Sequence, residues 1–249
     1  MTDAEWWTGA EVAGMLLFLS QMEPPPGPGI SSGRFHTFAA ACAARVDPLL
    51  SDEVRRIVDR LREPPARDPS PEWQIYWREF AELSEATEPV QVTTAAGDYR
   101  AVCAAAVRRS ATLAAGQWML GRPYHTARNV AWQAARAVEL ADRLASYPVG
   151  TPVPSDVLAF GNEPVSTAER VAQADLVRCV FGNPFHPVAV DPGWRTEAVV
   201  SLARGMDATR DFAAMPVLAD ALEDILAHAR GPGPHARGCH VLDRVLGRW

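Results

Sequence analysis

The strongest constraint on the fold is the alternation of helix-periodic apolar segments with proline-rich breaks. Apolar residues recur at the spacing of one helical face, for example at Phe35, Phe38, Ala39 and Cys42. The segment "PPPGPG" at 24–29 cannot continue a helix, because proline lacks a backbone N–H and clashes with the preceding turn. No series of segments with period-2 alternation indicates a β-sheet. The sequence therefore predicts an all-α fold.

Helix-start signals divide the chain into about nine or ten helices in a compact bundle. "TDAE" at 2–5 and "STAE" at 166–169 are capping boxes, in which a Ser or Thr and a Glu three residues later bond each other's backbone. The last two helices, expected at 213–229 and 234–247, have the apolar spacing of a HEAT-like pair. The other helices are expected near residues 2–22, 31–46, 51–62, 71–83, 98–117, 124–146, 166–181 and 195–208.

The loop at 147–164, "YPVGTPVPSDVLAFGNEP", is the strongest candidate for a domain boundary. It separates an N-terminal helical region, 1–146, from a C-terminal helical region, 165–249. The helices before this loop are rich in alanine, which lets helices approach closely and is typical of a bundle interior. We therefore expect the two regions to form one continuous globular unit joined by the loop.

The charge balance bears on which partners the protein can bind. Its net charge is −6, whereas a dedicated nucleic-acid-binding domain usually carries a basic stripe. All 24 basic residues are arginine, so no lysine is available as a Schiff-base nucleophile or a P-loop phosphate ligand. This bias is typical of a GC-rich genome and indicates a bacterial protein. We therefore expect a protein partner or a homo-oligomer, and no nucleic acid.

Neither the apolar segments nor the cysteines indicate a membrane-bound or secreted protein. The N-terminal apolar run at 12–19 is too short to span a bilayer. The cysteines are far apart and form no CxxC motif, unlike the dense spacing of a disulfide scaffold. We therefore expect free thiols in a soluble, cytoplasmic protein that does not bind membranes. The cysteines are Cys42, Cys103, Cys179 and Cys239.

Three blocks of the sequence carry a resemblance to a family. They are "DLVRCVFGNPFHPVAVDPGW" at 175–194, "FAAMPVLADALED" at 212–224 and "HARGPGPHARGCHVLDRVLG" at 228–247. Through these blocks the chain resembles a large family of uncharacterised bacterial proteins, found abundantly in planctomycetes, with FGNPFxPV and GPGPHxRGC blocks. The resemblance implies a common fold and no particular catalytic activity. The chain departs from the family pattern at His186 and His240, and it keeps only Cys42 where the family has a C-x-C-C cluster.

The corner "HARGPGPHARGCH" at 228–240 contains the best candidate site. His228 lies near the end of one expected helix, while His235 and Cys239 lie one turn apart on the next, which is expected to begin at Pro234. Two nitrogen ligands and one sulfur ligand suit zinc with an open fourth position. Zinc is the only cofactor indicated, and only as an alternative. In the opposing interpretation, Cys239 packs in the core and the histidines cap helix carbonyls or face solvent.

Two further hypotheses concern the same corner. Cys239 and His235 could act as a nucleophile and its base, since a helix N-terminus favours a thiolate. Arg230 and Arg237, beside the expected helix N-terminus, could bind an anion. As a whole, the sequence favours a helical interaction or regulatory module, and leaves open whether the protein is an enzyme. The alternative is a metal-binding protein or an enzyme that uses the corner at 228–240.

Two other features carry structural expectations. In "FGNPFHP", we expect Phe181 and Phe185 to fill the core and Gly182 to take a positive φ, which favours a rigid corner over a recognition surface. Trp6 and Trp7 cannot both face one core, because successive helical residues diverge by about 100°. The exposed member of this pair is a candidate partner contact.

Overall fold

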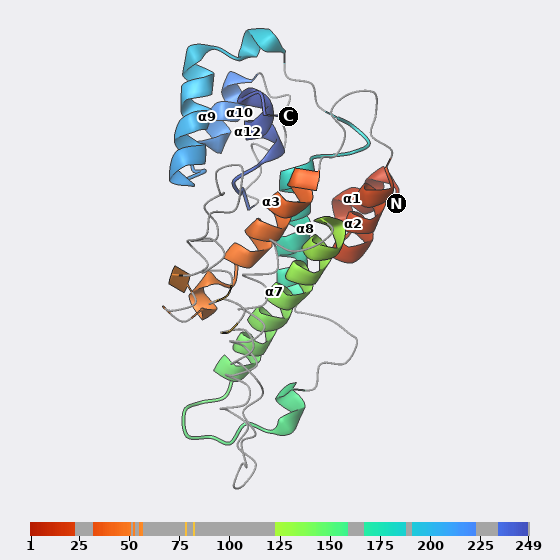
Figure 1. Cartoon of the computed structure of the whole chain (residues 1–249), viewed down its shortest axis with the longest axis vertical. Coiled ribbons are helices and arrows are strands. Elements are labelled where there is room, and N and C mark those ends of the chain that lie inside the picture. The colour runs from red at the N-terminus through yellow and green to blue at the C-terminus, as the bar shows by residue number, and fades with distance from the viewer. Residues whose placement is uncertain are drawn as a thin grey trace. The chain divides into compact units, whose positions relative to one another are not determined.

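The regular structure of the chain is helical. In the computed structural model (Figure 1), no strand occurs within the described residues, which confirms the predicted all-α fold. None of the described helices is both long enough and apolar enough to cross a lipid bilayer. Some expected helices lie outside the described residues, namely those at 71–83 and 98–117 and nearly all of that at 51–62. The structure describes residues 1–22, 32–50, 123–158, 167–187, 191–222 and 234–248, together with 52, 55, 56, 78 and 82.

The chain forms two compact units. The first combines residues 1–41 with 170–249, and the second comprises residues 42–169. The two ends of the chain therefore belong to one unit. This division differs from the boundary expected at 147–164. That expectation depends on the composition of the loop alone.

The first unit contains most of the described helices. Figure 1 shows α9, α10 and α12 as one group, and the contacts between α9 and each of the other two agree with this grouping. The apolar face expected on α3 is buried, including Phe35 and Phe38. The elements are α1 (Asp3–Thr8), α2 (Val12–Gln21), most of α3 (Ser32–Ala44), most of α8 (Thr167–Phe181), the 3-10 helix η4 (Pro192–Trp194), α9 (Glu197–Thr209), α10 (Met215–Ala221) and α12 (His240–Val245).

The N-terminal helix expected at 2–22 is interrupted. The capping box at its start is confirmed, since Thr2 N–H donates to Glu5 Oε2 at 2.7 Å and Glu5 N–H donates to Thr2 Oγ1 at 3.2 Å. The first helix nevertheless ends at Thr8, and Gly9 takes an extended conformation. A Cβ on Gly9 would lie 2.5 Å from Glu5 O, so this tight end accepts only glycine.

A buried arginine explains why the break is tolerated. Arg178 on α8 donates from Nε and Nη2 to Trp6 O at 2.9 and 2.8 Å, and also to Gly9 O. Its Nη1 forms an ion pair with Asp175 at 2.8 Å. Carbonyl groups that a continuous helix would have used are thus bonded by a guanidinium. The side chain that caps α1 comes from a helix far away in the sequence.

The "FGNPFHP" segment forms a corner packed on the N-terminal helices. Phe181 is buried and its ring lies 5.1 Å from that of Phe35, while Phe185 stacks on Phe18 at 5.3 Å. Asn183 Nδ2 donates to Asp3 Oδ1 at 2.9 Å, and Asn183 Oδ1 accepts from Phe185 N at 2.8 Å. The same Asp3 contacts His186, whose Nε2 lies 3.1 Å from Oδ2. These contacts give the segment a structural role.

The last helix begins later than expected. Residues 234–239 are not helical, and α12 begins at His240, so the expectation of a helix that starts at Pro234 is wrong. The reason is the turn before it, in which Gly238 has a φ of 81°. A right-handed helix cannot pass through that conformation. The second helix of the HEAT-like pair is therefore short, and residues 223–233 lie outside the described part of the chain.

The second unit is built around α7 (Pro123–Ala145), which confirms the helix expected at 124–146. The 3-10 helices η1 (Asp47–Leu49) and η3 (Ser155–Leu158) contact α7. An apolar cluster joins Leu140 of α7 to Val153 and Val157. Arg45 also forms an ion pair at 2.5 Å with Glu169, whose side chain is only 2% exposed, so this carboxylate is neutralised inside the unit.

Candidate metal site

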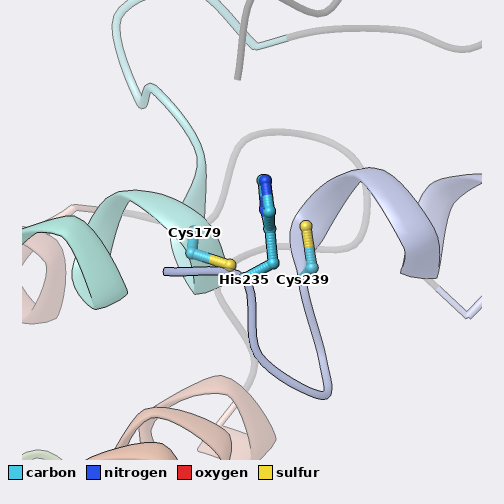
Figure 2. A group of neighbouring side chains, drawn as sticks. All are labelled: Cys179, His235 and Cys239. Carbon is cyan, nitrogen blue, oxygen red and sulfur yellow. The ribbon is translucent and has the colours of Figure 1, made fainter. Parts of the chain in front are cut away.

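Three side chains with metal-binding atoms meet in the first unit: Cys179, His235 and Cys239 (Figure 2). One ligand atom from each, a sulfur or an imidazole nitrogen, lies within 4.8 Å of the others. Figure 2 shows that they come from α8, from the segment before α12 and from the start of α12. The site therefore joins cysteines that stand 60 positions apart in the sequence.

The end of α8 fixes the position of Cys179. Gly182, directly after the helix, has a φ of 72° and donates its N–H to Arg178 O at 2.9 Å, as is common where helices end. A Cβ on Gly182 would lie 3.0 Å from the ring of His240. Both the backbone conformation and the close ring favour glycine at position 182. Because α8 ends directly before it, at Phe181, Cys179 lies in the last turn of the helix.

A tight turn positions the other two ligands. Cys239 N–H donates to Ala236 O at 3.0 Å, and Gly238 occupies the left-handed position of the turn. A Cβ on Gly238 would lie 2.2 Å from Cγ2 of Thr37, so the turn packs directly against α3. The carbonyl oxygen of Cys239 then accepts from Asp243 N at 2.9 Å, which makes Cys239 the N-cap of α12.

The two thiols lie inside the apolar core. Cys179 and Cys239 are fully buried in a cluster with residues of α9, α10 and α12, and His235 is half-buried. A hydrogen bond with Cys239 raises the pKa of the Cys179 thiol well above its usual range, and burial raises it further. In the absence of a metal ion, the surroundings of Cys179 therefore favour its neutral thiol form. A metal ion would favour the thiolate form, which is the form that binds metals.

Polar groups hold the backbone around Cys179. His240 Nδ1 lies 2.9 Å from Cys179 O, and Arg34 donates to the carbonyl of the next residue, Val180. Arg34 also forms an ion pair with Asp243 at 3.4 Å. Burial lowers the pKa of Arg34 to about 10, while Asp243 and both thiols of the site act in the opposite direction. The guanidinium thus supplies a positive charge that favours thiolates at the site.

The structure brings together two of the three residues expected to bind metal. His235 and Cys239 both belong to the group, although they do not share a helical face as expected, because α12 begins only at His240. The turn, rather than one helical repeat, brings them together. His228 lies outside the described residues.

Sequence reasoning missed Cys179 as a ligand. It stands on a different helix, 56 positions before His235, and no short spacing rule connects the two. Its only signal is its place in the last turn of an expected helix, directly before "FGNPFHP". That signal becomes informative only when the structure shows that the end of α8 lies beside the turn before α12.

The helix end in the anion hypothesis lies further along the chain than expected, because α12 begins at His240, three residues after Arg237. Arg237 does not stand beside a helix that begins at Pro234, and its Nε lies 3.9 Å from Oδ1 of the buried Asp207. Arg248 contacts the other oxygen of the same carboxylate at 2.7 Å. Arg230 lies outside the described residues. Arg237 thus takes part in an ion-pair network around the buried Asp207.

The donor set of the group determines its chemistry. Two sulfurs and one imidazole favour zinc and other borderline or soft cations, whereas magnesium and calcium prefer oxygen ligands. Zinc bonds of about 2.0 to 2.3 Å in a tetrahedron hold ligand atoms roughly 3.5 to 3.8 Å apart. The observed limit of 4.8 Å is therefore about 1 Å wider than a bound ion requires. As a nucleophile–base pair, Cys239 and His235 are less well suited, because a fully buried thiol has little access to a substrate.

The comparisons with known proteins give no independent indication of function. No protein-family model, no curated protein and no solved structure matches this chain. The resemblance to the planctomycete family therefore stays a prediction that depends on the sequence blocks alone. Any inference about function has to start from the site.

Proposed function

We propose that this protein binds a zinc-type metal ion through Cys179, His235 and Cys239. The observation that carries the proposal is that ligand atoms from three separate segments lie within 4.8 Å of one another. Two sulfurs and an imidazole are a donor set that zinc prefers. This proposal takes up the alternative that the sequence offered for the corner at 228–240, with Cys179 added to it.

The surroundings of the group support a structural role for the ion. Both cysteines belong to the apolar cluster formed by α9, α10 and α12, and His235 precedes α12 in a non-helical segment. An ion bound there would connect the end of α8 to the start of α12. Because the unfolded chain has no preformed site, the free energy of metal binding would stabilise the folded protein.

The test is elemental analysis of the full chain, purified without added metal and without a metal-affinity tag. We expect about one zinc per chain in the wild type, and loss of that zinc in Cys179→Ser, His235→Ala and Cys239→Ser. The matched control is Cys42→Ser, which alters a buried cysteine outside the group and is expected to keep its zinc. Circular dichroism shows whether each variant remains folded.

Two results would contradict the proposal. One is a metal-free wild-type protein that also binds added zinc with a dissociation constant weaker than about 1 μM. The other is stoichiometric zinc that persists in the folded Cys179→Ser and Cys239→Ser variants. A metal-free protein whose variants only melt at lower temperature would leave the cysteines with a packing role.

A second candidate function is the interaction module favoured by the sequence, and exposed aromatic side chains support it. Trp6 is fully buried while its neighbour Trp7 is 50% exposed, and Trp132 on α7 is 53% exposed. Exposed tryptophans are enriched at the centres of protein interfaces, and the net charge of −6 supports a protein partner over a nucleic acid. Light scattering tests self-association. A dimer that dissociates in Trp7→Ala or Trp132→Ala would support this function, and a strict monomer would remove the homo-oligomer.

We also propose that the protein is cytoplasmic, that its source is a bacterium and that it belongs to the family it resembles. Widely spaced cysteines without CxxC motifs support a reducing compartment, and the exclusive use of arginine supports a GC-rich genome. Trapping the thiols with an alkylating reagent in intact cells tests the location. Reduced thiols are expected, and fully oxidised cysteines in unstressed cells would count against it.

A further inference from the structure

The two thiols of the site are close enough to react with one another. The sulfur atoms of Cys179 and Cys239 lie within 4.8 Å of one another. Figure 2 shows one on α8 and the other at the start of α12. Cys42 is also a free thiol but is not part of the group. The chain thus holds one adjacent pair among its described cysteines.

We infer that Cys179 and Cys239 form a reversible disulfide when a peroxide reaches the metal-free site, and that this disulfide and metal binding exclude one another. The exclusion rests on the proposed zinc site, whereas the disulfide needs only the two thiols. The oxidant is a hydroperoxide such as hydrogen peroxide, and a small thiol restores the reduced pair. The site then has two stable forms, one cross-linked by the ion and one by sulfur.

The chemistry takes two steps. In the opened site, one cysteine loses its proton and attacks a peroxide oxygen as its thiolate, the O–O bond breaks, and the departing hydroxide takes up that proton to form water. The other cysteine attacks the resulting sulfenic sulfur, the S–S bond forms, and a second water leaves. Two thiols and one hydrogen peroxide thus give one disulfide and two waters. Two electrons pass from sulfur to oxygen.

The turn before α12 provides the movement that the reaction needs. A disulfide requires the sulfurs to approach from at most 4.8 Å to about 2.05 Å. Cys179 is held by α8, but Cys239 follows the non-helical residues 234–238. Arg237 in this turn is 61% exposed, so the turn borders solvent. Local opening of the turn both admits a water-sized peroxide to the buried thiols and frees Cys239 to move.

Metal binding opposes each part of this reaction. In the zinc-bound form, both sulfurs donate electron pairs to the ion and the turn is tied down through His235. At free zinc 100 times its dissociation constant, opening that requires ion release is suppressed about 100-fold. Conversely, the disulfide has no thiolate left to bind an ion. Oxidation is therefore expected to release zinc, and zinc to slow oxidation.

The test uses the full chain, reduced and freed of metal by a chelator. Hydrogen peroxide at a small excess is expected to remove two alkylatable thiols. Trypsin cleaves after Arg178, Arg195, Arg237 and Arg244, so the disulfide would join the peptides 179–195 and 238–244. Dithiothreitol should separate them, Cys42→Ser should behave as the wild type, and saturating zinc should slow the reaction at least tenfold. In His235→Ala, the disulfide should still form while protection by zinc is lost.

The failures of the two proposals can be told apart. A disulfide between these peptides in a protein that binds no zinc would overturn the zinc site and leave the thiol pair intact. The redox inference would be overturned if the protein bound zinc but did not form this disulfide. In that case peroxide would give sulfinic acid at either cysteine, or a disulfide to Cys42 or Cys103. A disulfide that forms only in urea, and not in protein that circular dichroism shows to be folded, would overturn the redox inference as well.

Discussion

His240 Nδ1 donates a hydrogen bond of 2.9 Å to the carbonyl oxygen of Cys179, which connects the first residue of α12 to the last turn of α8. The carbonyl can only accept, so Nδ1 carries the proton. The ring is buried and fills the space beside Gly182. His240 is thus a positioning residue that holds a ligand-bearing backbone and does not bind the ion itself.

Replacement of this histidine should affect both stability and metal binding. In His240→Leu, the buried carbonyl of Cys179 loses its partner, which is expected to lower the free energy of unfolding by about 1–3 kcal/mol. Partners that orient metal ligands typically change metal affinity by about 10- to 100-fold, and a loss in that range is expected. Urea unfolding of the metal-free protein and zinc competition titration measure the two effects. The exposed His125, as His125→Ala, is the control, and unchanged zinc affinity in the folded His240→Leu variant would limit His240 to packing.

Arg178 should be replaceable by neither lysine nor an apolar residue. Its guanidinium bonds Trp6 O, Gly9 O and Asp175 at once, whereas lysine offers a single ammonium without this planar arrangement. We expect Arg178→Lys to lower the free energy of unfolding by about 2 kcal/mol and Arg178→Met by more, because buried carbonyls lose charged donors. Urea denaturation gives the values. Arg143→Lys, at a pair with Glu139 on α7, is the control and should change stability by less than about 0.5 kcal/mol.

Gly238 and Gly205 should respond to alanine in opposite directions. Gly238 has a φ of 81°, and a Cβ there would lie 2.2 Å from Thr37 Cγ2, so Gly238→Ala is expected to cost about 1–3 kcal/mol. Gly205 lies inside α9, and a Cβ there would meet nothing within 4 Å. Gly205→Ala is therefore expected to stabilise the protein by about 0.4–1 kcal/mol. Thermal unfolding measures both effects.

A compensating change separates the two causes at Gly238. Thr37→Ser removes Cγ2, so the double variant should recover the part of the loss that comes from the clash, and not the part that comes from φ. If Gly238→Ala were as stable as the wild type, the turn at 236–239 would have a different conformation from the one observed. The zinc affinity of the same variant reports on the position of Cys239.

Local signals predicted helices such as α3 and α7, and tertiary contacts decided where others begin and end. The spacing of Phe35 and Phe38 and the capping box at Thr2 are properties of short segments, so the sequence alone was sufficient to predict them. The end of α1 at Gly9 depends instead on Arg178, which is 169 residues away. Likewise, the late start of α12 depends on the packing of Gly238 against α3.

The candidate site follows the same division. His235 and Cys239 are close in sequence and could be found from residue type and spacing. Cys179 reaches them only because α8 ends at Gly182 and the turn before α12 packs beside it. No local pattern encodes that approach, so the third ligand could be found only from the structure.

The Arg34–Asp243 ion pair should give stability a specific dependence on pH. Burial raises the pKa of the Asp243 carboxyl, although Arg34 and Arg248 oppose the shift. The folded protein therefore binds a proton at this carboxyl more tightly than the unfolded chain, whose aspartate pKa is about 3.9. Relative to Asp243→Asn, the stability contribution of the carboxyl is fully present below this value and is lost as pH rises through the raised pKa of the folded state.

The difference in unfolding free energy between the wild type and Asp243→Asn should accordingly shift in favour of the asparagine variant as pH rises from about 3 to 7. Urea unfolding at several pH values measures this slope, which is independent of any constant cost from losing the contact with Arg34. Asp142→Asn, at an exposed position of α7, is the control. A slope of opposite sign would mean that the attraction of Arg34 outweighs burial, so that the ion pair stabilises the ionised carboxylate next to the thiols of the site.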